Sequence, residues 1–183
     1  MAETTAALVE TRDTKLEIIM GREALDKLAA ATVLVLGCGG VGSNCCEALA
    51  RGGIGHFVIL DKDIIAPSNI NRQAIAFQST IGKRKVNVME AMIHDINPAA
   101  TVIKRTEYLL SDNIDEFFTS VLEQTDGKLD YVVDAIDTIS PSSPLPNMLR
   151  TTTFVWLAPW AGPTSSIPSA SALPTFSIRY VTP

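Results

Sequence analysis

The sequence has 183 residues, of which 46% are hydrophobic and 6% aromatic, and its formal net charge is −5. This size and composition predict one soluble domain with a single hydrophobic core, and the acidic balance excludes a protein-wide basic surface for nucleic acid. Because the apolar stretches are no longer than strands and the N-terminal residues mix acidic and basic side chains, we expect no membrane span and no signal peptide, and a cytoplasmic location.

Hydrophobic spacing predicts helices and strands that alternate along the chain. Two short helices on either side of Gly21 occupy residues 11–30 and lead into the first strand. The predicted strands are residues 31–36, 56–61, 101–108 and 131–136, and the predicted helices between them are residues 43–52, 82–97 and 114–125. This alternation predicts a Rossmann-like, doubly wound α/β fold with a mostly parallel sheet and a nucleotide at the carboxyl ends of its strands.

The composition changes after Pro141. Residues 142–183 hold seven of the ten prolines, both tryptophans, and neither an acidic residue nor a lysine. They follow neither helix nor strand periodicity, so we expect a sheet truncated after its fourth strand and an irregular tail. A disordered Pro/Ser-rich segment is one explanation. The other is a frameshift near the Pro141 codon, because the codons of residues 150–160, read from their third base, permit an Asn-rich break followed by an apolar strand. The expected organisation is therefore a helical segment (1–30), a nucleotide-binding domain (31–141) and this tail (142–183).

A glycine-rich turn joins the first predicted strand to its helix, in the run Gly37-Cys38-Gly39-Gly40-Val41-Gly42-Ser43. Glycines allow a tight turn and a close approach to phosphate, and the first turn of the helix offers unpaired N–H groups. Asp61 ends the second strand, where a carboxylate can accept hydrogen bonds from ribose hydroxyls. The alternative is a carboxylate that caps the next turn. The motif alone is a weak signal, because dehydrogenases, methyltransferases and adenylating enzymes share it.

Polar and cationic side chains after Asp61 distinguish this site from one for a redox cofactor. They are Asp63, Asn69, Asn71, Arg72, Gln73, Lys85 and Asp137. An Arg fork can grip two phosphate oxygens while a Lys acts as a mobile point charge, so Arg72 and Lys85 suit a triphosphate whose charge moves during reaction. Each of three residues also has an explanation without a binding role. Asp63 can be a solvated carboxylate, Asn71 a loop amide that bonds its own backbone, and Lys85 a surface lysine.

The ordered series of motifs resembles the adenylating domain of the ubiquitin-activating-enzyme-like superfamily of ThiF, MoeB and HesA type. The series consists of the glycine turn, Asp61-Lys62-Asp63, Ser68-Asn69-Ile70-Asn71-Arg72-Gln73, Gly82-x-x-Lys85, Ile96-Asn97-Pro98 and Asp134-Ala135-Ile136-Asp137-Thr138. Within that superfamily the Asn-x-Asn-Arg-Gln run and the later Asp-Ala-Ile-Asp-Thr run are most similar to the tRNA threonylcarbamoyladenosine dehydratase branch. The resemblance covers residues 12–141.

This resemblance implies ATP as substrate and Mg²⁺ as cofactor. It makes Arg72, Lys85 and Asp137 the catalytic residues, with Asp137 binding Mg²⁺ through the ATP phosphates. It places Asp61 on the ribose, and it assigns nucleotide binding also to Gly37, Gly39, Gly40, Gly42, Ser43, Asp63, Asn69, Asn71 and Gln73. It further implies a tRNA substrate, a homodimer in which Arg12 reaches the partner's site, and a sulfur-transfer partner protein.

Three other functions compete with adenylation of the threonylcarbamoyl carboxylate on tRNA. They are activation of the C-terminus of a ubiquitin-like sulfur carrier, an inactive nucleotide-binding remnant, and a dinucleotide oxidoreductase. All three cysteines (Cys38, Cys45 and Cys46) lie in or beside the glycine turn, and none follows it to carry a thioester, which favours activation of a small acyl group. Their spacing suggests neither a disulfide framework nor zinc, and buried reduced thiols are the ordinary reading.

Overall fold

The central strands carry apolar side chains at nearly every position, so the sheet that they build is buried on both faces. The structure, a computed structural model, describes residues 10–110, 112–136, 153–156 and 178–179. Four parallel strands lie in the order β3-β2-β1-β4. They are β1 (Thr32–Leu36), β2 (His56–Leu60), β3 (Thr101–Arg105) and β4 (Tyr131–Asp134).

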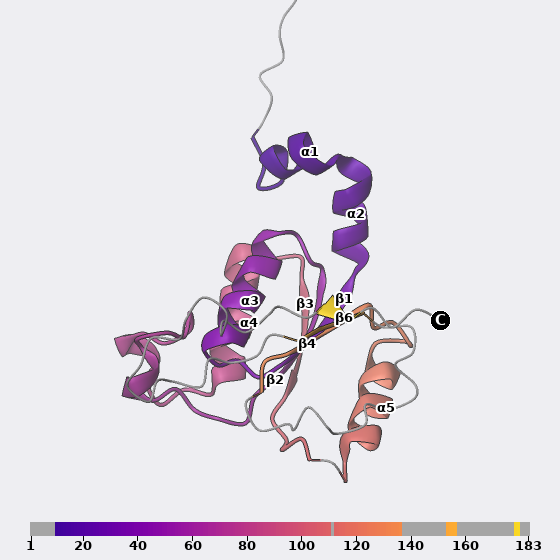
Figure 1. Cartoon of the computed structure of the whole chain (residues 1–183). Helices are drawn as coiled ribbons and strands as arrows, with labels where there is room; N and C mark the ends of the chain where they lie inside the picture. Colours follow the sequence, from indigo (N-terminus) through magenta and orange to yellow (C-terminus); the bar gives the residue numbers. More distant parts are fainter. Residues whose placement is uncertain (1–9, 111, 137–152, 157–177, 180–183) are drawn as a thin grey trace, which may run out of the picture.

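Helices cover both faces of this sheet (Figure 1). On one face α3 (Gly40–Arg51) and α4 (Lys85–Ile96) pack against Val33 and Val35, and on the other face α5 (Ile114–Gln124) packs against Leu34 and Leu36. Successive residues of a strand point to opposite faces, so the unbroken apolar run of β1 serves both cores. The doubly wound α/β fold expected from the sequence is confirmed.

The remaining helices lie at the N-terminus and in the loop after β2. The first two are α1 (Thr14–Met20) and α2 (Arg22–Ala30), which meet at Gly21 as expected, and α1 lies away from the sheet (Figure 1). Two single 3₁₀ turns, η1 (Pro67–Asn69) and η2 (Gln78–Thr80), shape the loop between β2 and α4. No helix among the described residues is long and apolar enough to cross a membrane.

The strand register brings the ends of three strands together. Leu36 pairs with Leu60 on one side and with Asp134 on the other. The carboxyl ends of β1, β2 and β4 therefore lie side by side along one edge of the sheet. The turn after β1 lies between the segments that follow β2 and β4. In a sheet of this topology a crevice opens where the chain reverses direction across the sheet, which here is between β1 and β4.

Two glycines make the turn after β1 possible. Gly37 has φ +91°, a left-handed value that side chains disfavour, and a Cβ there would lie 2.9 Å from the carbonyl oxygen of Ala135. A Cβ at Gly42, in the first turn of α3, would overlap the carbonyl oxygen of Gly37. The helix can start this close to the strand only because Gly42 has no side chain.

The structure differs from the sequence-based expectation in the tail. Two short strands, β5 (Thr153–Trp156) and β6 (Ile178–Arg179), extend the sheet beyond β4, with β5 parallel to β4 and β6 antiparallel to β5. We expected the sheet to end at its fourth strand because proline and serine dominate residues 142–183. The run Thr-Phe-Val-Trp nevertheless consists of residue types that favour strands, and an open edge of β4 offers it a ladder.

We predict that Gly42→Ala destabilises the fold, whereas Gly39→Ala leaves it nearly unchanged. The new methyl group at position 42 would overlap backbone, and relieving the overlap would separate α3 from β1 at a cost of about 3 kcal/mol or more. A Cβ at Gly39, where φ is −79°, meets no heavy atom within 4 Å. Urea unfolding of both variants measures the difference. Equal stability of the two variants would contradict the close approach described here.

Candidate functional site

A cavity of about 440 Å³ lies at the carboxyl ends of the parallel strands. Nine of the residues singled out in the sequence line it: Gly37, Gly39, Gly40, Asp61, Asp63, Asn69, Arg72, Gln73 and Lys85. They come from the turn after β1, the end of β2, the loop before α4 and the start of α4. Residues more than 45 positions apart in the sequence therefore meet at one site.

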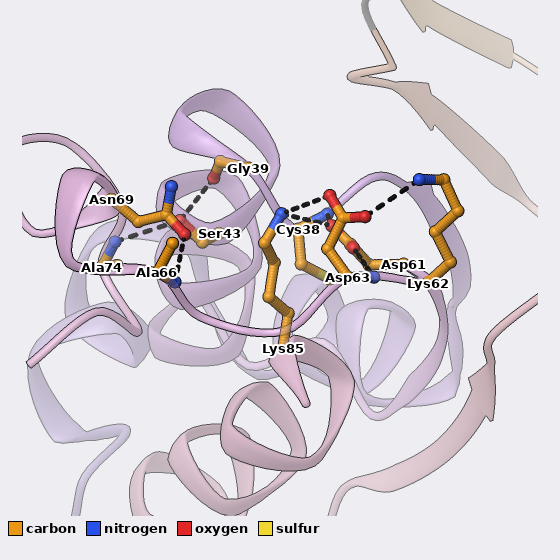
Figure 2. Close-up of polar contacts among 10 residues, drawn as sticks. All are labelled: Cys38, Gly39, Ser43, Asp61, Lys62, Asp63, Ala66, Asn69, Ala74 and Lys85. Atoms are coloured by element: carbon orange, nitrogen blue, oxygen red, sulfur yellow. Dashed lines mark hydrogen bonds and ion pairs between the residues drawn. The ribbon is translucent and has the colours of Figure 1, made fainter. Parts of the chain in front are cut away.

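The Asp61 carboxylate joins the glycine turn to the end of β2. Its Oδ2 accepts a hydrogen bond from the Cys38 N–H at 2.8 Å, and its Oδ1 accepts one from the Asp63 N–H at 2.8 Å (Figure 2). The side chain is only 8% exposed. Asp61 thus caps the turn that follows it, the alternative that the sequence left open. It also keeps acceptor capacity for a hydroxyl group, because a carboxylate offers about four acceptor positions.

Lys85 is buried beside two carboxylates. Its Nζ lies 3.4 Å from Asp61 Oδ2 and 3.0 Å from Asp63 Oδ2, as Figure 2 shows. The side chain is 7% exposed, so Lys85 is not the solvated surface lysine of the alternative reading. A buried ammonium needs such partners because burial removes its hydration. The ion pairs hold the positive charge at the wall of the cavity.

Arg72 supplies a positive charge that no carboxylate of the described residues neutralises. Its Nη1 donates hydrogen bonds to the Ser68 carbonyl at 3.1 Å and to Asn71 Oδ1 at 3.0 Å. The aliphatic part of the side chain lies over Gly40, where a Cβ would come within 3.2 Å of the Arg72 methylenes. The guanidinium therefore lies next to the glycine turn. An anion at this turn would meet Arg72 without first displacing an acidic side chain.

The three amide side chains of the loop have different roles. Asn69 Oδ1 accepts from the Ala66 N–H at 2.9 Å and so shapes the η1 turn, while Asn71 serves as an acceptor for Arg72 outside the cavity lining. Gln73 is 6% exposed, and its Oε1 is buried without a hydrogen-bond donor among the described residues. A buried acceptor without a donor is costly, and a hydroxyl or N–H group of a bound molecule would satisfy it.

Ser43 and Gly42 do not line the cavity but support it. The fully buried Ser43 hydroxyl donates to the Gly39 carbonyl at 2.6 Å and accepts from the Ala74 N–H at 3.0 Å (Figure 2). It thereby ties the glycine turn to the loop that carries Arg72. Arg12 lies far from this cavity and pairs with Asp13 at 2.9 Å. Asp137 is outside the described residues.

The loop after β3 contributes lining residues that the sequence analysis did not single out. They are Glu107, Tyr108 and Leu109, and Lys62 lies opposite them after β2. Arg105 pairs with Glu107, so that carboxylate is already neutralised. The only sequence signal for these residues is their position directly after a predicted strand. Any segment that follows the carboxyl end of a parallel strand can reach this edge of the sheet.

The first turn of α3 completes an anion site. No side chain of the described residues caps this turn, so its N–H groups are open toward the glycine loop. These N–H groups carry the positive end of the helix dipole. Together with Arg72 and Lys85 they bring positive charge to the cavity, an arrangement chemically suited to a phosphate group, and the neighbouring Asp61 carboxylate can accept hydrogen bonds from hydroxyl groups.

Asp134 ends β4 beside the glycine turn. Burial raises the pKa of its carboxyl group, and a hydrogen bond that Oδ1 accepts from the Ile136 N–H at 3.1 Å offsets only part of this effect. Asp63 behaves in the opposite way. Partial burial raises its pKa, but hydrogen bonds from Lys62 and Lys85 outweigh burial and bring it below its ordinary value.

The described residues contain no group of three or more His, Cys, Asp or Glu side chains that could hold a metal ion by themselves. The three cysteines are unpaired, and Cys38 and Cys46 are buried. A hydrogen bond with the Cys38 side chain, together with burial, raises the pKa of the Cys46 thiol, which makes it a poor nucleophile.

The sequence profile of the ThiF family matches residues 11–147 of the chain. Three relatives illustrate the similarity. The chain is 46% identical over 123 residues to a tRNA threonylcarbamoyladenosine dehydratase of Bacillus subtilis, an alignment that covers 67% of this chain and 46% of the relative. It is 36% identical to the Escherichia coli protein of that name, covering 69% and 45%. It is 37% identical to an adenylyltransferase and sulfurtransferase MOCS3 of Culex quinquefasciatus, covering 62% and 24%.

Solved structures show the same similarity. A crystal structure of E. coli tRNA N6-threonylcarbamoyladenosine dehydratase in complex with ATP has a TM-score of 0.69 and 33% identity, and the match covers 79% of this chain and 58% of that one. A complex of the same E. coli protein with AMP has a TM-score of 0.68. The chain spans about half the length of the curated dehydratases that it matches.

We predict that Asp134→Asn stabilises the protein at neutral pH and that this gain disappears in acid. A carboxyl group with a raised pKa disfavours the folded state where it is ionised, so the penalty is complete above the folded-state pKa and absent below the unfolded value near 3.9. Asn keeps an acceptor for the Ile136 N–H. Urea unfolding from pH 7 to pH 3.5 measures the difference in free energy of unfolding. A gain that stayed constant over this range would contradict the assignment.

Proposed function

Because this chain belongs to the ThiF family, we propose that it binds ATP at the glycine turn and adenylates a carboxylate. The family membership confirms the resemblance stated from the motifs. The single observation that carries the proposal is the meeting of Arg72 and Lys85 at the mouth of this turn, beside the open first turn of α3. A dinucleotide oxidoreductase has no comparable need for two cations at its phosphates.

Adenylation is a displacement at phosphorus, and the proposed roles follow from its charge changes. A carboxylate oxygen of the acceptor attacks the α-phosphorus of ATP, and the bond to the bridging oxygen breaks with release of pyrophosphate. Arg72 would hold phosphate oxygens with its fork, while the α3 N–H groups and Lys85 would stabilise the charge that develops on the transferring group and on pyrophosphate. Lys85 can follow this charge because Asp63, its closer partner, is half exposed and can be exchanged for phosphate.

Mg²⁺ fits this arrangement as a proposed cofactor. A magnesium ion in such sites takes one or two carboxylates and completes its shell with phosphate oxygens and water. Ala135 and Ile136 line the cavity, and Asp137 follows them directly in the sequence, so we assign its carboxylate to the ion. The ion would supply positive charge to the phosphates.

We propose the threonylcarbamoyl group of N6-threonylcarbamoyladenosine in tRNA as the carboxylate, with reaction in the cytoplasm. The similarity to dehydratases of that name supports this substrate. The adenylate would then be displaced intramolecularly to give a cyclic, dehydrated group with release of AMP. Activation of a sulfur-carrier C-terminus is the alternative. The similarity to MOCS3 supports it less, because the alignment covers 24% of that protein, against 46% and 45% of the two dehydratases. We also propose a sulfur-transfer partner protein. This proposal rests on the family resemblance alone.

The proposed homodimer has one supporting feature in the structure. Ile18 and Ile19 on α1 are 80% and 78% exposed, and Met20 beside them is also exposed. Neighbouring apolar side chains on a short helix are costly in water and are typical of a covered surface. In the proposed dimer α1 packs on the second copy, and Arg12, which precedes it, approaches the partner's site.

A second candidate is an inactive nucleotide-binding remnant, and the reason to consider it is the composition of residues 142–183. The family profile ends at residue 147, so residues 148–183 have no support from it. If the frameshift hypothesis for residues 142–183 is correct, the gene continues in another frame after the Pro141 codon. Sequencing the gene and its transcript across this codon tests the hypothesis, and an intact frame removes it.

We predict that Arg72→Ala lowers the rate of ATP–pyrophosphate exchange by about 100-fold or more, because it removes a charge that stabilises the transferring phosphate. Arg72 is exposed, so the free energy of unfolding should change little. Exchange is measured with tRNA that carries N6-threonylcarbamoyladenosine, and in parallel with a small carrier protein that ends in Gly-Gly.

The matched control is Arg51→Ala on α3, where Arg51 pairs with Glu47 at 2.8 Å outside the cavity. This variant should exchange like the parent chain. Equal losses of exchange and stability in Arg72→Ala would refute its catalytic role. Exchange with the carrier protein and not with tRNA would identify the carrier protein as the substrate. No exchange with either would favour the inactive remnant.

We predict that Ile18→Asp combined with Ile19→Asp dissociates the proposed homodimer, since two buried charges would oppose the apolar contact. Sedimentation velocity of the parent chain should show a dimer and that of the double variant a monomer. Leu110→Asp places a charge at another exposed apolar position, 54% exposed and away from α1, and should leave the dimer intact. A monomeric parent chain would refute the dimer.

A further inference from the structure

An aromatic ring and a cation form a pair at the cavity wall on the β3 side, away from the glycine turn. Lys62 Nζ lies 4.1 Å from the centroid of the Tyr108 ring. The same ammonium contacts Asp63 Oδ1 at 3.0 Å, which holds it in place. Lys62 follows β2, Tyr108 follows β3, and both line the cavity. The adenylation chemistry described above uses neither side chain.

The strand order determines the direction in which a nucleotide extends across this cavity. The phosphate site lies after β1, Asp61 lies at the end of the neighbouring β2, and β3 is the next strand beyond it. A nucleotide with its phosphates at the glycine turn and its ribose at Asp61 therefore directs its base toward the loop after β3. Tyr108 and Leu109 are the lining residues of that loop that offer apolar surface.

Tyr108 has the properties of a stacking surface. The side chain is 62% exposed although it lines a cavity, so a large part of the ring has no cover within the described chain. Lys62 interacts with the π system of this ring, and Asp63 in turn restrains Lys62. An exposed tyrosine is commonly only solvated, but this ring is restrained, faces the site and has an apolar neighbour. Bases stack on such rings without directional hydrogen bonds.

We propose that Tyr108, positioned by Lys62, is the surface on which the base of the bound nucleotide stacks. The inference rests on the proposed function, because it requires phosphates at the glycine turn. Tyr108 would contact the base directly, and Lys62 would act through the ring as a positioning residue. The contacts from Asp63 to Lys85 and to Lys62 link the phosphate end of the cavity to the base end.

Calorimetric titration of the full 183-residue chain with ATP and with inorganic triphosphate tests this inference. Tyr108→Ala should weaken ATP binding about tenfold or more, as expected from the loss of one base–aromatic stack, and should leave triphosphate binding unchanged. Tyr108→Phe keeps the ring and should bind ATP like the parent chain. Lys62→Met keeps the side-chain length but removes the charge, and should weaken ATP binding about two- to fivefold.

Leu110→Ala is the matched control, because Leu110 belongs to the same loop, is 54% exposed and does not line the cavity. It should bind both ligands like the parent chain. The inference is overturned if Tyr108→Ala binds ATP normally, or if it loses ATP and triphosphate equally, which would mean that the ring only maintains the loop. A parent chain that binds neither ligand would refute the proposed function itself, and the stacking role with it.

Discussion

The Asp61 carboxylate is the contact on which the geometry of the site depends. It accepts the Cys38 N–H from the glycine turn, accepts the Asp63 N–H from its own loop, and lies 3.4 Å from the Lys85 ammonium. These groups come from β1, β2 and α4, so one nearly buried side chain fixes three elements relative to one another. Hydrogen bonds to an ionised group are stronger than those between neutral groups, which makes a carboxylate better suited to this position than an amide.

The balance of charge around this contact explains how the site can receive a polyanion. Lys62 and Lys85 are matched by Asp61 and Asp63, and Glu107 is matched by Arg105, so the described lining is close to neutral apart from Arg72. One unmatched guanidinium and a helix N-terminus are a small opposing charge for a triphosphate. This shortage of positive charge is the reason for proposing Mg²⁺, because a divalent cation would neutralise phosphate charge that the described lining does not.

The fold was predictable because its signals are local. The apolar run of β1 and the spacing of helices and strands give a doubly wound sheet from periodicity alone, and the predicted elements agree with the structure to within a few residues. The pairing of β5 with β4 was missed because a four-residue strand in a proline-rich segment has no periodicity to detect. Its formation depends on the open edge of β4, which is a property of the assembled sheet.

The site was predictable in composition but not in the role of each residue. Residue type and order identified Arg72, Lys85 and Asp61 as a group, since phosphate chemistry limits which side chains can serve it. Whether Ser43 faces a ligand or the Ala74 N–H depends on a distance of a few ångströms between α3 and a loop 30 residues later, and no local pattern encodes that distance. Tyr108 shows the converse case. It belongs to no motif, yet the strand order places it at the end of the cavity toward which the proposed nucleotide would direct its base. Topology can therefore suggest a role for a residue that no sequence pattern marks.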